Sequence, residues 1–98
     1  MSHYFISRIT IKDPEEYSKY LAKAGEVFKM FKGKYLVVDD SPELLEGNWN
    51  CTRTVVIEFE SKTDFDLWYS SPEYQAILKF RLNAAECNTV LVKGLDLE

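Results

Sequence analysis

Cysteine and histidine are scarce in this sequence, which has two cysteines and a single histidine. Cys51 and Cys87 are far apart and form no CxxC pair, so neither a disulfide framework nor a zinc site is expected. We interpret both as reduced thiols in or near strands. His3 lies close to the N-terminus. Because a general base must be held in place to work, His3 is a poor candidate for that role.

Long apolar runs and basic stripes are missing as well. No apolar run approaches the roughly 20 residues that a membrane span needs, and the first residues lack the basic and apolar regions of a signal peptide. We therefore expect a cytoplasmic protein that does not enter a membrane. The formal net charge is −4. Nucleic-acid affinity comes mostly from neutralising phosphates, so no nucleic-acid partner is expected.

The sequence contains none of the short motifs that carry known chemistry. It has no Ser-His-Asp set, no nucleophile elbow, no phosphate-binding loop and no dinucleotide fingerprint. We therefore expect no cofactor, neither a metal ion nor a nucleotide.

What the chain does have is a globular composition that is rich in aromatic residues. Its 98 residues, 46% hydrophobic and 29% charged, predict one folded domain over residues 1–98. Aromatic residues make up 14% of the chain. Such an excess in a small domain indicates apolar surface beyond one core, for a partner subunit or a flat ligand.

Periodicity and capping signals predict the order of the elements. Strands are expected over residues 3–11, 34–46, 52–59 and 89–92. The second of these should be one long, bulged strand that bends at its middle, where Pro42 breaks the pattern.

Three helix starts are predicted between the strands. Asp13 should cap a helix that runs to about Phe31, and Ser61 should cap a second one. Ser71 followed by Pro72 should then restart a helix that continues through Ala85.

The element order β-α-β-β-α-β predicts an α+β fold of the ferredoxin-like type. Right-handed crossovers place the four strands in one antiparallel sheet and the helices on one face of it. Apolar residues occur on both sides of the strands, so the other face should be buried too. A second copy of the chain in a two-fold homodimer is the economical cover.

Several stretches of this sequence resemble one known family. They are Asp-Pro-Glu-Glu-Tyr-Ser-Lys-Tyr at 13–20, Leu-Glu-Gly at 45–47, Val-Ile-Glu-Phe at 56–59, Trp-Tyr-Ser-Ser-Pro-Glu-Tyr-Gln at 68–75 followed by Arg81, and the closing Val-Leu-Val at 90–92 with Gly94. In order and spacing they are similar to the domain of unknown function family 1330. The resemblance implies a dimeric α+β barrel with two sheets face to face, and it implies no reaction.

Four aromatic residues are candidates for the walls of a ligand pocket: Tyr17, Tyr20, Trp68 and Tyr74. Tyr17 and Tyr20 lie three positions apart on one helical face, where their phenols could donate to a ligand carbonyl. The alternative is core packing with the hydroxyls at the rim.

Three polar residues are candidates for anchors in the same pocket: Glu58, Ser71 and Arg81. Ser71 has an ordinary alternative role as a helix cap. Arg81 shares a helical face with apolar residues, so its guanidinium should be partly buried and paired. Its partner could be Glu58, Glu46 or the carboxylate of a ligand.

These residues support two hypotheses of function. The first is a homodimer that binds or transforms a small organic molecule without metal or nucleotide, in an aromatic cavity of a few hundred Å³. The second is a non-catalytic structural or protein-interaction dimer, with a filled interior and exposed apolar patches outside the dimer interface.

Overall fold

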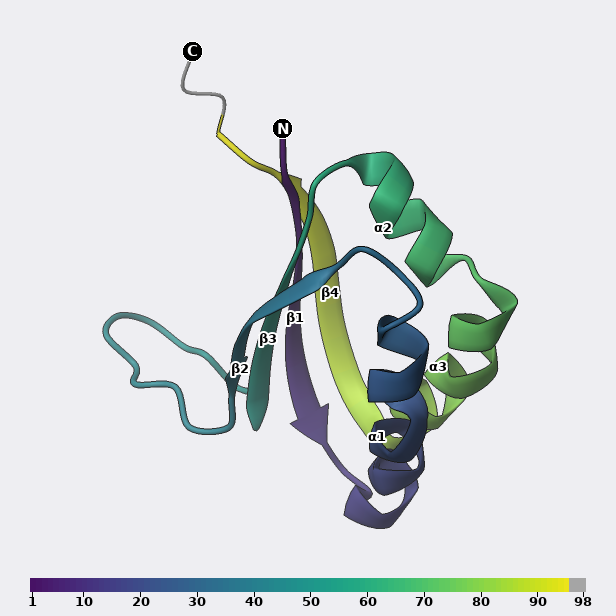
Figure 1. Cartoon of the computed structure of the whole chain (residues 1–98). Coiled ribbons are helices and arrows are strands. Elements are labelled where there is room, and N and C mark those ends of the chain that lie inside the picture. The colour runs from purple at the N-terminus through teal and green to yellow at the C-terminus, as the bar shows by residue number, and fades with distance from the viewer. Residues whose placement is uncertain (96–98) are drawn as a thin grey trace.

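The computed structural model describes residues 1–95 and has four strands and three helices in that part of the chain. In chain order they are β1 (His3–Ile11), α1 (Pro14–Phe28), β2 (Lys34–Asp39), β3 (Arg53–Phe59), α2 (Lys62–Tyr69), α3 (Pro72–Ala84) and β4 (Ala85–Lys93). All three helices cover the same face of the sheet, and the other face is uncovered (Figure 1). Within the described residues, no helix is long and apolar enough to cross a membrane.

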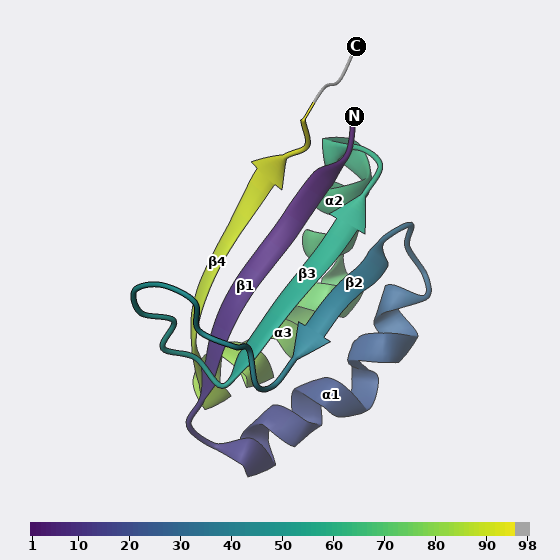
Figure 2. The ribbon, with the colours of Figure 1, turned by 90° about the vertical axis from the view of Figure 1, so that its left-hand side faces the viewer.

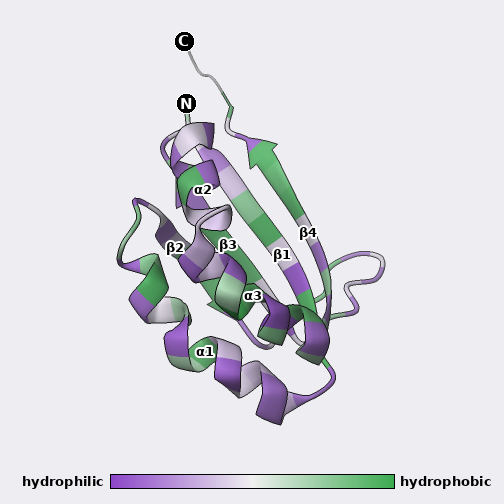
Figure 3. Ribbon diagram, turned by 90° about the vertical axis from the view of Figure 1, so that its right-hand side faces the viewer, coloured by the Kyte–Doolittle hydropathy of each residue, from purple (hydrophilic) through white to green (hydrophobic). Residues whose placement is uncertain are grey.

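The four strands form one sheet in the order β2-β3-β1-β4, and every pair of neighbours is antiparallel. This confirms the predicted ferredoxin-like arrangement. Alternation along β1 and β3 points Phe5, Ile9, Ile57 and Phe59 towards the helices, where all four are buried. Figure 3 shows hydrophobic bands on the strands that lie behind the helices.

The core between sheet and helices is aromatic. Trp68 is 1% exposed and packs with its ring centroid 5.4 Å from those of Phe5 and Phe59. The Tyr74 ring lies closer still, at 4.2 Å from Trp68. Offset and edge-on aromatic pairs of this kind stabilise by about 1 kcal/mol each beyond their buried area.

The three predicted helix caps are confirmed. Asp13 accepts a hydrogen bond from the backbone N–H of Glu16, and Ser61 accepts one from that of Asp64. Ser71 accepts from the backbone N–H of Tyr74, so the kink at 70–72 begins a separate helix. The first helix ends at Phe28 rather than at Phe31, and residues 29–31 continue it as hydrogen-bonded turns.

The prediction of one long strand over residues 34–46 is wrong. β2 ends at Asp39, whose carboxylate accepts from the backbone N–H of Ser41 and turns the chain away from the sheet. Residues 40–52 form a loop, here called the arm, that projects over the uncovered face (Figure 2). The bulge exists, but it lies between Tyr35 and Val37 and not at the middle of the predicted strand.

The last strand is longer than predicted. Residues 85–88 follow α3 directly and pair with β1, from Ala85 opposite Ile11 to Asn88 opposite Arg8. Their sequence, Ala-Glu-Cys-Asn, is not typical of a strand, so pairing with β1 overrides the local preference.

An apolar row crosses the uncovered face of the sheet. Val37, Val56, Ile6 and Val90 lie next to one another on the four strands. Val37 is 40% exposed and Val90 is 55% exposed. Among the described residues no helix covers this row, in contrast to the residues on the other face of the sheet.

Candidate functional site

Arg81 is the most unusual residue of the core. It comes from the last turns of α3 and is only 2% exposed. Its Nη2 donates to the hydroxyl of Tyr74 over 3.5 Å, and its Cζ lies 5.7 Å from the ring centroid of Tyr20 and 6.0 Å from that of Phe5. Its positive charge is therefore held by aromatic rings and one long hydrogen bond.

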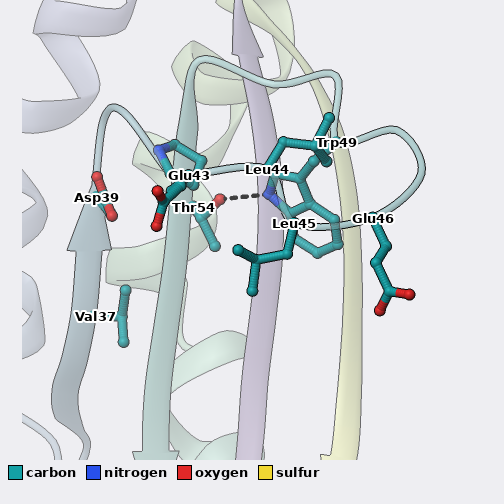
Figure 4. A pocket seen from close by; sticks show the side chains of 9 residues that line it. Val37, Asp39, Glu43, Leu44, Leu45, Glu46, Trp49 and Thr54 are labelled. Carbon is teal, nitrogen blue, oxygen red and sulfur yellow. Dashed lines mark hydrogen bonds between the residues drawn. The ribbon is translucent and has the colours of Figure 1, made fainter.

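Arg81 has no carboxylate partner among the described residues. Its Nε and Nη1 atoms are buried and make no hydrogen bond. The predicted ion pair with Glu58 or Glu46 is wrong. Glu58 lies on the uncovered face, where its carboxylate accepts from the hydroxyls of Ser2 at 2.8 Å and Tyr4 at 3.4 Å. Glu46 belongs to the arm on that same side of the sheet (Figure 4).

The charge on Arg81 is retained despite this burial. Burial by itself would lower the pKa of Arg81, but the phenol oxygens of Tyr74 and Tyr20 outweigh that effect, and the pKa lies above its ordinary value. The core thus contains a permanent cation with free N–H groups.

Tyr20 and Tyr74 form a buried phenol pair beside this cation. Their hydroxyls are 2.8 Å apart, and their rings meet edge-on at 6.2 Å. Burial raises the pKa of Tyr20, with a further contribution from Tyr74, and burial also raises the pKa of Tyr74. Both phenols are therefore neutral and protonated at physiological pH.

A further buried hydrogen-bond donor belongs to Trp68, whose ring packs against Tyr74. Its indole Nε1 is buried and has no hydrogen-bond partner in the part of the chain that the structure describes. Its ring packs on that of Tyr74, which in turn contacts Arg81. A buried donor without an acceptor destabilises the folded state. An acceptor that bound to the free N–H groups of Arg81 or Trp68 would therefore stabilise it.

The partly open cavity beside Arg81 is much smaller than predicted. It has a volume of about 50 Å³, against the few hundred Å³ usual for a ligand site. Residues of α1, β1, β2, β3 and α3 line it: Phe5, Ile9, Tyr17, Tyr20, Leu21, Ala24, Tyr35, Val38, Arg53, Val55, Ile57 and Arg81. None of them carries a carboxylate.

The aromatic rings explain the small volume. Tyr17 and Tyr20 pack against each other at 5.7 Å, and the guanidinium of Arg53 covers Tyr17 at 6.0 Å. Arg53 is held there by Asp40, with Nε 2.8 Å from the carboxylate. Asp40, at the start of the arm, is thus the carboxylate that holds Arg53 in place.

Ser71 lies outside this cavity. It is 7% exposed, and its hydroxyl donates to the carbonyl of Trp68 while accepting from the backbone N–H of Tyr74. These two hydrogen bonds of the Ser71 hydroxyl connect the end of α2 to the start of α3. Of the predicted site residues, Tyr17, Tyr20 and Arg81 line the cavity, and Trp68 and Tyr74 pack directly behind it.

Phe5 is the most notable of the lining residues that sequence reasoning did not single out. It lines the 50 Å³ cavity and also a second hollow of about 190 Å³ beside β4, which Phe65, Tyr69, Thr89, Val90 and Leu91 complete. Alternation along β1 predicts that Phe5 faces the helices, but it gives no sign of two hollows meeting at this ring.

A third hollow of about 470 Å³ lies on the other side of the sheet, between the arm and the uncovered face. Figure 4 shows Leu44, Leu45 and Trp49 of the arm above Val37 and Thr54 of the strands. The indole Nε1 of Trp49 donates to the hydroxyl of Thr54 over 2.9 Å. This hollow is open and does not touch Arg81. Its indole donor is satisfied, unlike that of Trp68.

Comparison with known families gives one match. The family described as Domain of unknown function (DUF1330) matches residues 2–95, which include every residue of the site. No curated protein matches the sequence.

Solved structures confirm the fold. A protein of unknown function from Rhodopseudomonas palustris is 19% identical, with 97% of this chain and 83% of that chain covered and a TM-score of 0.79. SnoaB, a cofactor-independent oxygenase from Streptomyces nogalater, is 15% identical, with 97% and 94% covered and a TM-score of 0.66. A dimeric ferredoxin-like protein of unknown function from Thermobifida fusca is 16% identical, with 94% and 90% covered and a TM-score of 0.65. At these identities the likeness shows the fold alone.

Proposed function

The chain belongs to the DUF1330 family of unknown function, and from that premise we propose that it is a homodimer that binds a small organic molecule through an acceptor oxygen beside Arg81. The molecule would bind between sheet and helices in each subunit, without metal or nucleotide. Arg81 and Trp68 would donate to the oxygen, while Tyr20 and Tyr74 would form the adjoining wall.

The single observation that carries this proposal is the unsatisfied guanidinium. A buried charge without a counter-ion destabilises the folded state by several kcal/mol unless something compensates it. Arg81 has only one long hydrogen bond and two aromatic faces. Its Nε and Nη1 groups lack any acceptor among the described residues. A ligand oxygen would supply what the chain itself does not.

The homodimer is supported by the apolar row on the uncovered face. Val37 and Val90 would leave water if a second sheet packed on this face. The Thermobifida fusca relative is described as dimeric. The relative described as a cofactor-independent oxygenase supports, by analogy of fold, a site that works without a cofactor.

A thermal-shift screen tests the proposed binding. A panel of small organic acids and ketones is compared with the matching hydrocarbons and protonated amines, which carry no acceptor, on the wild type, Arg81→Met and the control Arg8→Met. A ligand at a hundred times its dissociation constant stabilises by about 2.7 kcal/mol, which is several degrees in a domain of this size. We expect acceptor-bearing hits on the wild type and on Arg8→Met, and their loss in Arg81→Met. Hits that survive in a folded Arg81→Met protein would contradict the proposal.

A second candidate function, the non-catalytic interaction dimer, is favoured by one observation. The interior is nearly filled, and the outer helix surfaces carry exposed apolar side chains, among them Leu67 and Leu82, each 54% or more exposed. A screen without any hit on the wild type would favour this alternative over ligand binding.

A further inference from the structure

Two hollows approach each other on the helix-covered side of the sheet. The smaller one, of about 50 Å³, lies between α1 and the strands and contains Arg81 in its lining. The larger one, of about 190 Å³, opens between α2 and β4 and has Arg81 outside its lining. Phe5 is the one residue that lines both.

The ring of Phe5 lies near both the guanidinium and the aromatic residues of the larger hollow. On one side, the Cζ of Arg81 lies 6.0 Å from the ring centroid. On the side of the larger hollow, the rings of Phe65 and Tyr69 lie 6.3 Å and 6.4 Å away and stack on each other at 5.2 Å. A ring entering this hollow would thus meet aromatic walls first and the cation only beyond Phe5.

Volume and polarity together define a ligand class. The larger hollow is open to solvent at Thr89 and Val90, and its volume of about 190 Å³ is large enough for one aromatic ring against Phe65 and Tyr69. The polar atoms beyond Phe5 are the free donors of Arg81, which need an acceptor. The lining of both hollows contains no carboxylate.

Building on the function proposed above, we infer that Phe5 sets the size of the ligand, and that the ligand is a single-ring aromatic anion. Its ring would lie against Phe65 and Tyr69, and its anionic oxygens would reach Arg81 as the Phe5 side chain changes rotamer. Neither hollow alone has the volume usual for a ligand site, whereas the two joined approach its lower end. The phenyl ring of Phe5 is what keeps them apart.

The test compares one-ring and two-ring carboxylates on variants of Phe5. Dissociation constants of benzoate and 2-naphthoate are measured by calorimetry for the wild type, Phe5→Leu and Phe5→Met. Removing the partition should favour 2-naphthoate over benzoate by roughly tenfold or more relative to the wild type, the scale of discrimination that small changes in an apolar pocket produce.

Phe59→Leu is the matched control. Phe59 lies on the same face of the sheet, is 0% exposed and packs on Trp68 and Phe65, but it lines neither hollow. The same truncation there should leave the ratio of the two constants unchanged. Adding Arg81→Met to Phe5→Leu should abolish binding of both acids.

The outcomes separate this inference from the proposed function. If the ratio of the two dissociation constants is unchanged in both Phe5 variants, or changes equally in Phe59→Leu, then Phe5 does not set ligand size and the inference is overturned. Acceptor-bearing hits that depend on Arg81 would still leave the proposed function standing. If neither carboxylate binds the wild type or any Phe5 variant, the aromatic anion is the wrong ligand class and the inference falls. A panel without any Arg81-dependent hit would remove the proposed function as well.

Discussion

At the scale of single residues, Arg81 is the proposed ligand anchor and also a buried charge that destabilises the folded state. Replacing a buried charge that lacks a counter-ion by an apolar residue of similar length removes an unsatisfied group from the core. We therefore expect Arg81→Met to be more stable than the wild type by about 1 kcal/mol or more in urea unfolding. A loss of more than about 2 kcal/mol would show that the aromatic contacts of Arg81 are a net support of the fold and would weaken its assignment to a ligand.

The phenol pair predicts how stability depends on alkaline pH. The folded-state pKa values of Tyr20 and Tyr74 lie above the ordinary value, mainly because of burial. Their contribution is fully present below the unfolded pKa of about 10 and is lost as pH rises from there towards the folded values. Each phenol should lower the unfolding free energy by up to about 1.4 kcal/mol per pH unit in that window.

Urea unfolding at several pH values from about 9 to about 11 measures this slope, because that range is centred on the ordinary tyrosine pKa of about 10. Tyr20→Phe should make it shallower because one of the two phenols is gone. An equal slope in the wild type and in Tyr20→Phe would mean that Tyr20 ionises in the folded protein without difficulty, against the burial described for it.

The partner of Arg81 illustrates what residue-level sequence reasoning can and cannot reach. Alternation puts Glu58 on the opposite side of its strand from Phe59, and Phe59 faces the helices. Because successive side chains of a strand point to opposite faces, Glu58 points away from Arg81 and cannot be its partner. That Arg81 lacks any other carboxylate depends on how three helices pack, which no local pattern contains.

At the scale of elements, the boundary between α2 and α3 depends on one hydroxyl. Ser71 both caps α3 and donates to the last turn of α2, and it is 7% exposed. Ser61 caps α2 in a more exposed position, where its hydroxyl accepts one hydrogen bond, from the backbone N–H of Asp64. Loss of a buried hydroxyl leaves more polar groups unsatisfied than loss of an exposed one.

We accordingly expect Ser71→Ala to destabilise the protein by about 2 kcal/mol and Ser61→Ala by about 1 kcal/mol. Thermal unfolding of the two variants side by side gives the comparison, with Ser61→Ala as the matched control. Equal losses would indicate that Ser71 acts as an ordinary cap and that the bond to Trp68 contributes nothing.

The elements themselves could be predicted where local signals and tertiary pairing agree. The caps at Asp13, Ser61 and Ser71 are local hydrogen bonds, and each was predicted correctly. The arm and the start of β4 could not be predicted in this way, because a strand forms only where a neighbouring strand pairs with it. Ala85 finds that neighbour in Ile11, whereas β2 has its last pair at Asp39.

At the scale of the whole molecule, the uncovered face predicts a dimer that can be separated from folding. Ile6 and Val56 belong to the apolar row and point away from the core. Val56→Lys should therefore keep the fold and shift the protein towards a monomer in light scattering. Leu82→Lys, on the outer surface of α3, is the control and should remain dimeric. A wild type that is a stable monomer at micromolar concentration would contradict the proposed homodimer.

The overall topology could be predicted because element order and handedness leave few arrangements of four strands. The size of the cavity could not. It depends on how the rings of Tyr17, Tyr20 and Tyr74 fill the space between layers, and a difference of one rotamer changes the volume by an amount comparable to the cavity itself.

The most direct test of the central claim follows two kinds of N–H group in one NMR titration with benzoate. Arg81 Nε–H and Trp68 Nε1–H are the buried donors of the proposed site. Trp49 Nε1–H, bonded to Thr54 beneath the arm, is an internal control. We predict that the Arg81 and Trp68 resonances shift together with one dissociation constant while that of Trp49 stays in place. Shifts confined to Trp49, or none at all with benzoate and with every hit of the thermal-shift screen, would contradict a ligand site at Arg81.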